Sequence, residues 1–375
     1  MKKNCTKKEL QPGMITIEDV KTPSGQVIVK KDTLLTAQII SRIGFYRIDD
    51  ILVEVPEVSE PKLQESVMQQ KEPVSQPKQQ STAPSYSQKV VRSKEFQTFQ
   101  IDYTKLLVDI RNNFEGYVFR GQPLNMDALL AGVNDLYHSR KTSLELFDML
   151  HNMRSNNDSV HAHCLNVALI SRRIGRWLKI EGADLDVLTL AGLLHDIGKL
   201  KIPAEILNKP GKYTDGEFAL VKQHTQFSYD LLKDLPLDER IKKAALSHHE
   251  RCDGHGYPSG LSQDEIEDFT QIVAIADVYD AMTAARAYRA PLCPFQVIDN
   301  FEKDGLSLYR PKLILTFLKH IANTYQNNRI LLSDGRPAEI VMLNDKYLSK
   351  PLVRLLDGTC IDLATTPSLH IQSLV

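Results

Sequence analysis

Short alternating apolar runs open the chain. Residues 14–17, 26–30 and 51–55 carry apolar side chains with the two-residue period of a β-strand. Residues 33–43 instead place apolar side chains three and four positions apart, as in a helix. The pattern predicts a small mixed β/α accessory domain over residues 1–55.

The next segment, residues 56–94, is rich in proline, glutamine and serine and has few large apolar residues. Such a segment cannot bury enough apolar surface to offset the entropy lost on ordering. We therefore expect a flexible or partly extended linker between two folded parts.

Helical periodicity dominates residues 95–328, where apolar side chains recur three and four positions apart. The expected helices span 103–110, 126–138, 143–153, 161–178, 186–200, 215–235, 238–249, 269–286 and 311–325. Strand-like runs then return at 339–343 and 351–356, around Asp334-Gly335 and Asp357-Gly358 turns. The chain is thus predicted to be mainly α, with a β-rich C-terminal extension over residues 329–375.

Composition narrows the functional classes. An apolar content of 42% supports a buried core, while a net charge of −1 gives no electrostatic case for binding a nucleic acid polymer or an anionic membrane. No run approaches the roughly 20 apolar residues of a membrane span, and the N-terminus lacks a secretory signal. The five cysteines are scattered and lack a Cys-x-x-Cys motif, which fits a reducing cytoplasm.

One apolar run contains three ionisable residues. His195, Asp196 and Lys199 lie among leucine, isoleucine and alanine side chains between residues 190 and 200. Burying such groups costs free energy unless they are paired, and a metal ion would pair them. An isolated His-Asp pair is more often a solvated surface feature, so the other histidines decide between these interpretations.

Further candidate ligands lie on other predicted helices, namely His163, His224, the pair His248-His249, and Asp277 in an apolar helix. Each has an ordinary structural explanation, such as a core histidine bonded to a carbonyl or a helix C-cap. Together they suit a di-metal site inside a helical bundle. Mixed imidazole and carboxylate ligands favour iron, manganese, zinc or cobalt over calcium.

The order of these residues resembles the HD phosphohydrolase superfamily. The stretch from His248 to Pro258, which reads HHERCDGHGYP, resembles more narrowly the HD-GYP family of cyclic di-GMP phosphodiesterases. The segments His195-Asp-Ile-Gly-Lys199 and Ala276-Asp-Val-Tyr-Asp-Ala-Met-Thr283 match as well, and the resemblance covers roughly residues 125–330.

The resemblance implies an HD-type helical bundle and a set of site residues. The implied metal ligands are His163, His195, Asp196, His224, His248, His249 and Asp277. Asp196 and Lys199 are the implied catalytic residues, Asp196 as the bridge between two metals and Lys199 as a contact of the scissile phosphate. Arg286 and Arg289 match substrate-phosphate contacts, and Gly256, Tyr257 and Pro258 match the loop that shapes the substrate pocket.

Departures from the family pattern bear on the number of metals. Ser159 stands where some members have a glutamate that supports a third metal, and Cys164 follows the first histidine in place of serine. Ser228 and Ala287 replace a common glycine and proline. We therefore expect two divalent metal ions, iron or manganese first, with zinc, cobalt, nickel or magnesium also compatible.

The resulting hypothesis is a cytoplasmic phosphodiesterase that hydrolyses cyclic di-GMP to pGpG, and further to GMP, through a metal-bridging hydroxide. Protein partners would dock through the Gly-Tyr-Pro loop or residues 1–55, and a homodimer is compatible. Two alternatives stay open. One is a degenerate domain that senses cyclic di-GMP or docks partners; the other is an HD hydrolase acting on another cyclic dinucleotide or a nucleotide.

Overall fold

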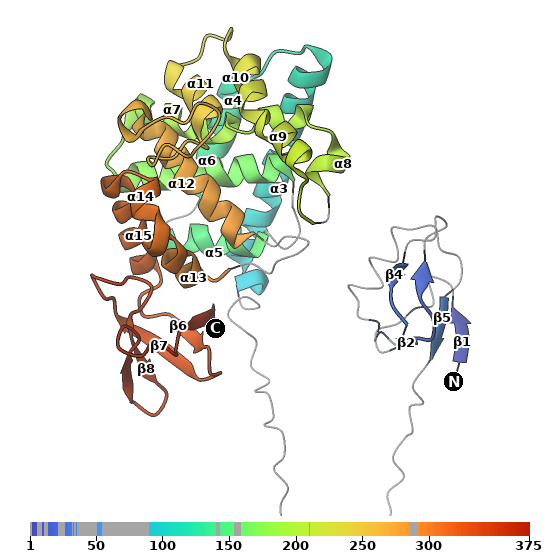
Figure 1. The fold of residues 1–375 in the computed structure, drawn as a ribbon, viewed down its shortest axis with the longest axis vertical. Coiled ribbons are helices and arrows are strands. Elements are labelled where there is room, and N and C mark those ends of the chain that lie inside the picture. Colours follow the sequence, from blue (N-terminus) through green and yellow to red (C-terminus); the bar gives the residue numbers. More distant parts are fainter. Residues whose placement is uncertain are drawn as a thin grey trace, which may run out of the picture. The chain divides into compact units, whose positions relative to one another are not determined.

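The computed structural model separates into two compact units, residues 1–80 and 81–375, each considered by itself (Figure 1). The described residues are 2–5, 10, 14–21, 27–31, 33, 35, 51–54, 90–139, 143–153, 159–209, 211–284 and 292–375. Most of the expected helix 33–43 and most of the expected linker lie outside these residues. Within the described parts, no helix has both the length and the apolar character needed to cross a membrane.

The N-terminal unit contains two small antiparallel sheets. Three strands are ordered β1-β5-β2, and β3 pairs with β4. Their bounds are β1 Lys2–Cys5, β2 Ile15–Thr16, β3 Val20–Lys21, β4 Val27–Val29 and β5 Ile51–Glu54. Leu35, Ile51 and Val53 are among the buried side chains of a small core. Strands β2, β4 and β5 fall inside the three runs predicted from the alternating pattern.

Helices build most of the second unit, which confirms the predicted mainly α fold class. The long helices are α3 Lys94–Arg120, α4 Met126–His138, α5 Ser143–Met153, α6 Val160–Trp177, α7 Gly182–Leu194, α12 Asp268–Thr283 and α15 Pro311–Thr324. The shorter ones are α8 Ala204–Leu207, α9 Asp215–Lys222, α10 His224–Leu232, α11 Glu239–Ser247, α13 Pro294–Asn300 and α14 Leu306–Leu308. Single turns occur at η1 Ile197–Lys201, η2 Gln263–Glu265 and η3 Phe301–Gly305.

Helix α6 forms the centre of the helical bundle and packs against α3, α4, α7, α12 and α15 (Figure 1). Most of its residues are buried, and these include the polar residues His161, Asn166, Ser171 and Arg172 as well as apolar ones. Ser159 is its N-cap, and the serine hydroxyl accepts a hydrogen bond from the backbone N–H of Ala162. The serine that departs from the family pattern therefore has a local structural role at the start of this helix.

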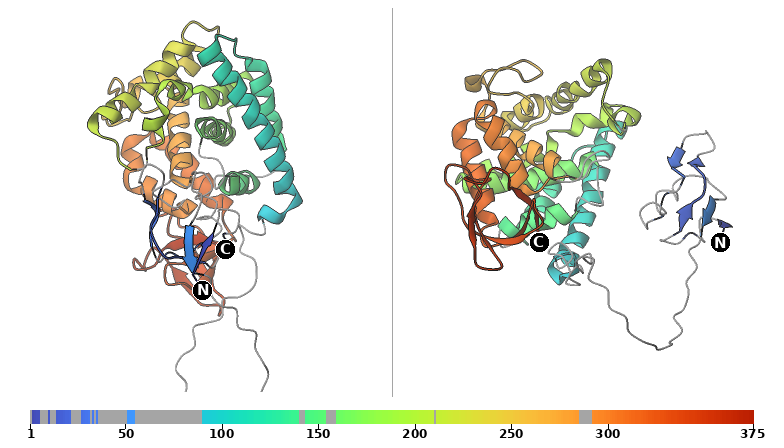
Figure 2. Two further views of the ribbon diagram at one scale, coloured as in Figure 1. Left: turned by 90° about the vertical axis from the view of Figure 1, so that its right-hand side faces the viewer. Right: turned by 60° about the horizontal axis from the view of Figure 1, so that its bottom comes forward.

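A five-stranded antiparallel sheet closes the chain, in the order β10-β6-β7-β8-β9. Its strands are β6 Arg329–Leu332, β7 Pro337–Met342, β8 Leu352–Leu355, β9 Cys360–Asp362 and β10 Ile371–Leu374. The sheet lies at one end of the helical domain beside α13 (Figures 1 and 2). Glu302 of η3 links the helices to the segment between β7 and β8. Its carboxylate accepts hydrogen bonds from the backbone N–H groups of Leu348 and Ser349 in that segment. The β-rich extension is confirmed.

The predicted helix 186–200 is wrong in its second half, since α7 ends at Leu194 and the chain continues as the tight turn η1. Gly198 explains the break. A Cβ at this position would stand 2.3 Å from the backbone oxygen of His224 and 2.3 Å from the backbone nitrogen of Ser228. The turn is buried throughout its first half, so its residues keep the apolar pattern of the helix before it.

The predicted helix 215–235 is also interrupted. Helix α9 ends at Lys222, Gln223 forms a turn, and α10 begins at His224. His224 therefore stands at a helix start and not in mid-helix. Because the apolar spacing runs through the turn, the sequence pattern could not reveal the change of direction.

Candidate metal centre

His163 projects from α6 between carboxylates of α12. Its Nε2 atom lies 2.9 Å from Oδ1 of Asp277 and 3.4 Å from Oδ2 of Asp196. Its Nδ1 atom lies 2.8 Å from Oδ2 of Asp280, one helical turn beyond Asp277. Asp280 thus fixes the ring orientation of His163, as a carboxylate behind a ligating histidine commonly does. Asp280 is a functional residue not predicted from the sequence, although its spacing from Asp277 in an apolar helix was a signal.

Three other histidines share one arrangement at helix ends. The Nδ1 atom of His195 lies 2.8 Å from the carbonyl oxygen of Gly192, that of His224 lies 2.6 Å from Val221, and that of His248 lies 3.0 Å from Ala244. A carbonyl oxygen only accepts, so each Nδ1 carries the proton and donates it. In the neutral ring, Nε2 is then left with a free lone pair.

These lone pairs converge. Nε2 of His224 and Nε2 of His248 lie 3.3 Å apart, and two acceptors at that distance cannot hydrogen-bond to each other. Nε2 of His195 is buried and has no hydrogen-bond partner among the described residues. Buried acceptors without donors are costly, and a cation between them would satisfy all three. The donor set therefore fits a metal ion.

Asp196 lies between two groups of imidazoles and is fully buried. Its Oδ1 atom is 3.2 Å from Nε2 of His224 and 3.6 Å from Nε2 of His248. Its Oδ2 atom is 3.3 Å from Nε2 of His195 and 3.4 Å from Nε2 of His163. One carboxylate therefore presents each oxygen to a different pair of ligands.

Three overlapping groups of these side chains could hold a metal ion in the described part of the chain. The groups are His163, His195 and Asp277; His224, His248 and His249; and His195, Asp196 and His248. Within each group the ligand atoms lie within 4.8 Å of one another. The structure brings all seven predicted ligands together, from α6, α12 and the ends of α7, α10 and α11.

The protonation states suit cation binding. Burial lowers the pKa of His224, His248 and His249, so these rings are neutral. Burial also raises the pKa of Asp196, but the Lys199 ammonium and His195 outweigh that effect and hold the pKa well below its usual range. Neutral imidazoles and ionised carboxylates are the forms that bind divalent metals.

His163 differs from the other histidines. Burial lowers its pKa, but the hydrogen bonds with Asp277 and Asp280 outweigh burial and raise the pKa to about 9. The ring is thus protonated at neutral pH in the metal-free protein. The same hydrogen bond from His163 offsets burial at Asp277 and holds its pKa well below the usual range.

Lys199 lies in η1 with a side chain that is largely shielded from solvent, and its ammonium bonds to Oδ2 of Asp196. It therefore neutralises part of the charge of the central carboxylate. The other two predicted phosphate contacts, Arg286 and Arg289, lie outside the described residues.

The Gly-Tyr-Pro loop folds back onto the end of α11. Gly256 packs so closely that a Cβ there would stand 2.4 Å from Cα of Glu250. The Glu250 carboxylate accepts hydrogen bonds from the backbone N–H groups of Ser259, Gly260 and Leu261, at 2.6, 3.1 and 3.0 Å. The ring of Tyr257 is thereby placed over His249, with 4.7 Å between the ring centroids.

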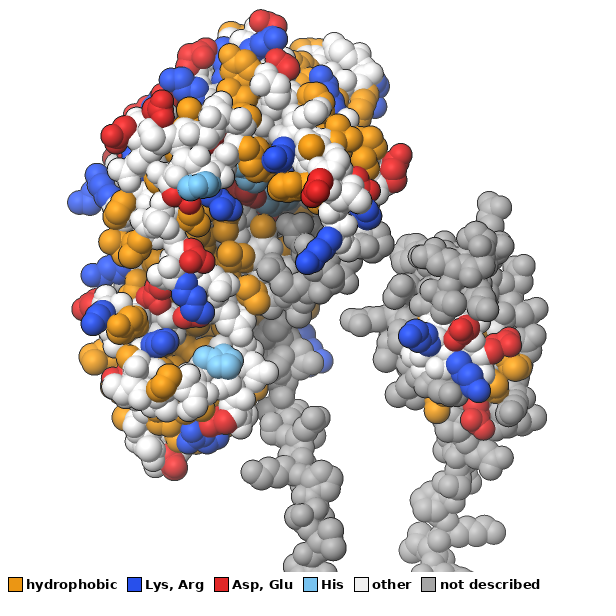
Figure 3. All heavy atoms as spheres, in the orientation of Figure 1, with side chains coloured by type: hydrophobic (Ala, Val, Ile, Leu, Met, Phe, Trp, Pro, Cys, Tyr) orange, Lys and Arg blue, Asp and Glu red, His pale blue; other side chains and the backbone are white. Residues whose placement is uncertain are grey.

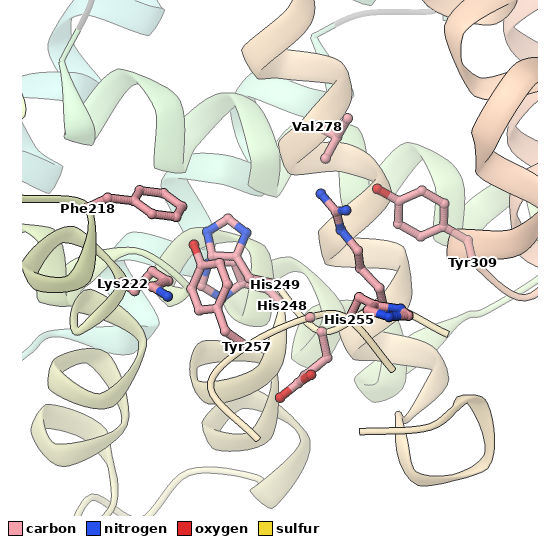
Figure 4. A pocket seen from close by; sticks show the side chains of 11 residues that line it. Phe218, Lys222, His248, His249, His255, Tyr257, Val278 and Tyr309 are labelled. Atoms are coloured by element: carbon pink, nitrogen blue, oxygen red, sulfur yellow. The ribbon is translucent and has the colours of Figure 1, made fainter. Parts of the chain in front are cut away.

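A cavity of about 270 Å³ lies over this edge of the histidine cluster. Figure 4 shows Phe218 and Lys222 on one side of Tyr257 and His249, with Val278 and Tyr309 on the other. In Figure 3, histidine and basic side chains lie close together on this face of the helical domain. Of the three loop residues predicted to contact substrate, Gly256 and Tyr257 line this cavity, whereas Pro258 is exposed and is not a lining residue.

Comparison with known proteins supports the sequence resemblance. Residues 139–313 match the family model described as the HD domain. A cyclic di-GMP phosphodiesterase of Thermotoga maritima is 36% identical over 191 residues, which cover 50% of this chain and 51% of that protein. The 3′3′-cGAMP-specific phosphodiesterase 2 of Vibrio cholerae is 32% identical over 199 residues, which cover 52% of this chain and 38% of that protein.

The matched region spans about half of these two relatives or less. Among solved structures, an HDGYP-type protein from Bdellovibrio bacteriovorus matches with a TM-score of 0.46 and 13% sequence identity. That match covers 84% of this chain and 98% of the Bdellovibrio chain.

Proposed function

We propose that this chain, which belongs to the HD domain family through residues 139–313, is a metal-dependent phosphodiesterase that hydrolyses cyclic di-GMP. The observation that carries the proposal is the position of Asp196. One oxygen faces the neutral imidazoles of His224 and His248. The other faces His163 and His195, and the buried Nε2 atom of His195 has no hydrogen-bond partner among the described residues.

Two sets of side chains would hold two divalent cations. His163, His195 and Asp277 form one set, and His224, His248 and His249 the other, with Asp196 between them. Iron or manganese is proposed first, and zinc, cobalt, nickel or magnesium is also compatible with mixed imidazole and carboxylate donors. When bound, such ions lower the pKa of a water molecule and neutralise charge on a phosphate group.

The chain's own residues supply the positioning. The Nδ1–H bonds to helix carbonyls and the Asp280 carboxylate hold the imidazoles in fixed orientations, so no ring has to reorient when a ligand binds. The Lys199 ammonium offsets negative charge at Asp196 and would do the same for a phosphate oxygen in its reach. The fixed Tyr257 ring offers a face on which a guanine base can stack.

A second candidate substrate is 3′3′-cGAMP. The Vibrio cholerae relative that matches over 199 residues is named for that substrate. Both substrates contain two phosphodiester groups and at least one guanine, so the same centre would serve either. The choice between them depends on the walls of the cavity and not on the ligand set.

The proposal is tested with purified full-length chain loaded with manganese or iron(II) under anaerobic conditions. Cyclic di-GMP, 3′3′-cGAMP and cyclic di-AMP are incubated separately, and the products are separated by chromatography. We expect metal-dependent conversion of cyclic di-GMP to pGpG and then GMP, and none with His195→Ala. Tight binding of cyclic di-GMP without turnover in any metal would favour the sensor alternative and contradict the proposal.

Three expectations about the cellular setting stay predictions. They are a cytoplasmic location, protein partners that dock through the Gly-Tyr-Pro loop or residues 1–55, and a homodimer. The Gly-Tyr-Pro loop is accessible to a protein partner at Pro258, which is exposed.

A further inference from the structure

Arg251 follows Glu250 at the end of α11, is exposed, and lines the cavity over the histidine cluster. No carboxylate of the described residues lies within ion-pair distance of its guanidinium. Other arginines nearby are paired: Arg240 with Asp184 and Asp238, and Arg310 with Asp268. An arginine without a counter-ion at a cavity wall is free to bind an anion.

The nearest acidic neighbour in the sequence is not available to Arg251. The Glu250 carboxylate is buried and is fully engaged by three backbone N–H groups of the following loop. These hydrogen bonds fix the backbone on both sides of Arg251. They also hold the negative charge of the Glu250 carboxylate in the loop, away from the cavity. Arg251 is thus held at a defined place with its charge unneutralised.

A second donor lines the same cavity. Tyr309 is buried, and its hydroxyl has no hydrogen-bond partner among the described residues. Arg251 and Tyr309 both line this cavity, and burial raises the pKa of Tyr309. Because the phenol stays protonated, it can donate to an anion held by the arginine.

The opposite side of the cavity carries a separate cation. The Lys222 ammonium lies 5.1 Å from the centre of the Phe218 ring and 5.8 Å from that of Tyr257. Figure 4 shows Lys222 and Tyr309 on opposite sides of Tyr257. The walls therefore carry positive charge beyond Lys199, which is bonded to Asp196 at the centre itself.

We propose that Arg251, together with the Tyr309 hydroxyl, binds the phosphodiester group of a cyclic dinucleotide that is not being hydrolysed. This inference rests on the proposed function. A cyclic dinucleotide has two phosphodiester groups, each with one negative charge, and the metal centre with Lys199 accommodates one of them. A guanidinium can donate two parallel hydrogen bonds to the oxygens of the other.

The test compares two substrates. Cyclic di-GMP has a second phosphodiester group, whereas bis(4-nitrophenyl) phosphate has only the one that is cleaved. For Arg251→Ala, kcat/KM for cyclic di-GMP should fall about 10-fold or more relative to kcat/KM for the small diester, mainly through KM. Arg251→Lys should recover part of the loss. Arg354→Ala removes an exposed arginine of β8 that is paired with Glu339. It should leave kcat/KM unchanged for both substrates.

A binding measurement gives a readout besides turnover. The dissociation constant of a phosphorothioate analogue of cyclic di-GMP should rise by a similar factor in Arg251→Ala and stay unchanged in Arg354→Ala. If Arg251→Ala lowers kcat/KM for cyclic di-GMP and for 3′3′-cGAMP by the same factor, the result supports a phosphate contact. A loss that depends on the base would overturn the proposal in favour of base recognition.

The outcomes for the two proposals are distinct. If the wild-type chain hydrolyses no cyclic dinucleotide, the proposed function fails, and analogue binding still tests Arg251. If the wild-type chain turns over cyclic di-GMP and Arg251→Ala has unchanged relative kcat/KM and unchanged analogue affinity, only the role of Arg251 is refuted.

Discussion

At the residue scale, the centre depends on how each imidazole is held. Three histidines donate Nδ1–H to a backbone carbonyl three or four residues earlier in the chain, so their neighbours in the sequence fix their orientation. His163 differs because it lies within a helix, where the carbonyls are already bonded. Asp280 of another helix holds its Nδ1 instead. This long-range contact is therefore the most informative one to remove.

Replacing Asp280 with asparagine should weaken metal binding while preserving side-chain volume. The amide cannot hold His163 by a charged hydrogen bond, so we expect manganese affinity to fall about 10–100-fold. Titration calorimetry with manganese measures the change. Asp299→Asn, at a partly exposed residue paired with Lys303, is the matched control. Unchanged manganese affinity in Asp280→Asn would contradict the orienting role.

The cysteines allow a test of burial at single residues. Burial raises the pKa of the Cys293 thiol to about 11, whereas Cys360 is exposed. At pH 8 only about one Cys293 thiol in a thousand is ionised, and the thiolate is the reactive form. Brief iodoacetamide treatment of the native chain should label Cys360 and leave Cys293 unmodified, as measured by peptide mass spectrometry. In urea both should react; equal labelling in the native chain would be inconsistent with this burial.

At the scale of elements, the turn η1 decides the geometry of the centre. It carries Lys199 and follows His195-Asp196, and it packs directly on the start of α10, which carries His224. Backbone contact therefore fixes the position of His195 and Asp196, which precede η1, relative to His224 of α10. Gly198 allows that approach because it has no side chain.

Gly198→Ala should destabilise the fold and disturb the centre together. The added methyl group would overlap backbone atoms that cannot move independently, at a cost of about 1–3 kcal/mol. Gly216→Ala is the matched control, because a Cβ in that part of α9 meets no atom within 4 Å. It should be neutral or stabilising by up to about 1 kcal/mol. Urea unfolding of both variants measures the difference, and equal stability would refute the close packing.

At the scale of the whole molecule, the C-terminal sheet shares one apolar core with the helices. Ile330, Leu332, Ile340 and Val353 are buried in the same cluster as the helix residues around the centre. The N-terminal unit has a separate small core, which includes Leu35 and Val53. The two ends of the chain should therefore contribute differently to stability.

Two truncations test that difference. Removing residues 329–375 takes many buried side chains from the shared core and should lower the free energy of unfolding by at least about 5 kcal/mol. Removing residues 1–80 should leave the unfolding midpoint of the helical domain within a few degrees. Calorimetric scans of both truncated chains provide the measurement. A stable helical domain without residues 329–375 would contradict the shared core.

The sequence alone determined the helices, the small β-rich parts and the identity of the seven ligand candidates. Apolar spacing is a local property, and α4 and α5 begin and end at the residues that the spacing predicts. The spacing could not detect the break after Leu194 or the turn at Gln223, because apolar residues recur at helical spacing on both sides of each break. Sequence order also gave no role to Asp280.

Only the tertiary structure decided which atoms face one another. The pairing of Asp196 oxygens with separate imidazoles, the contact between His163 and Asp280, and the absence of a described acidic partner for Arg251 all depend on segments distant in the chain. A ligand set is encoded by residue types at local spacings. The orientation of His163, the convergence of the Nε2 atoms and the neutralisation of each charge are set by packing between elements, which no local pattern contains.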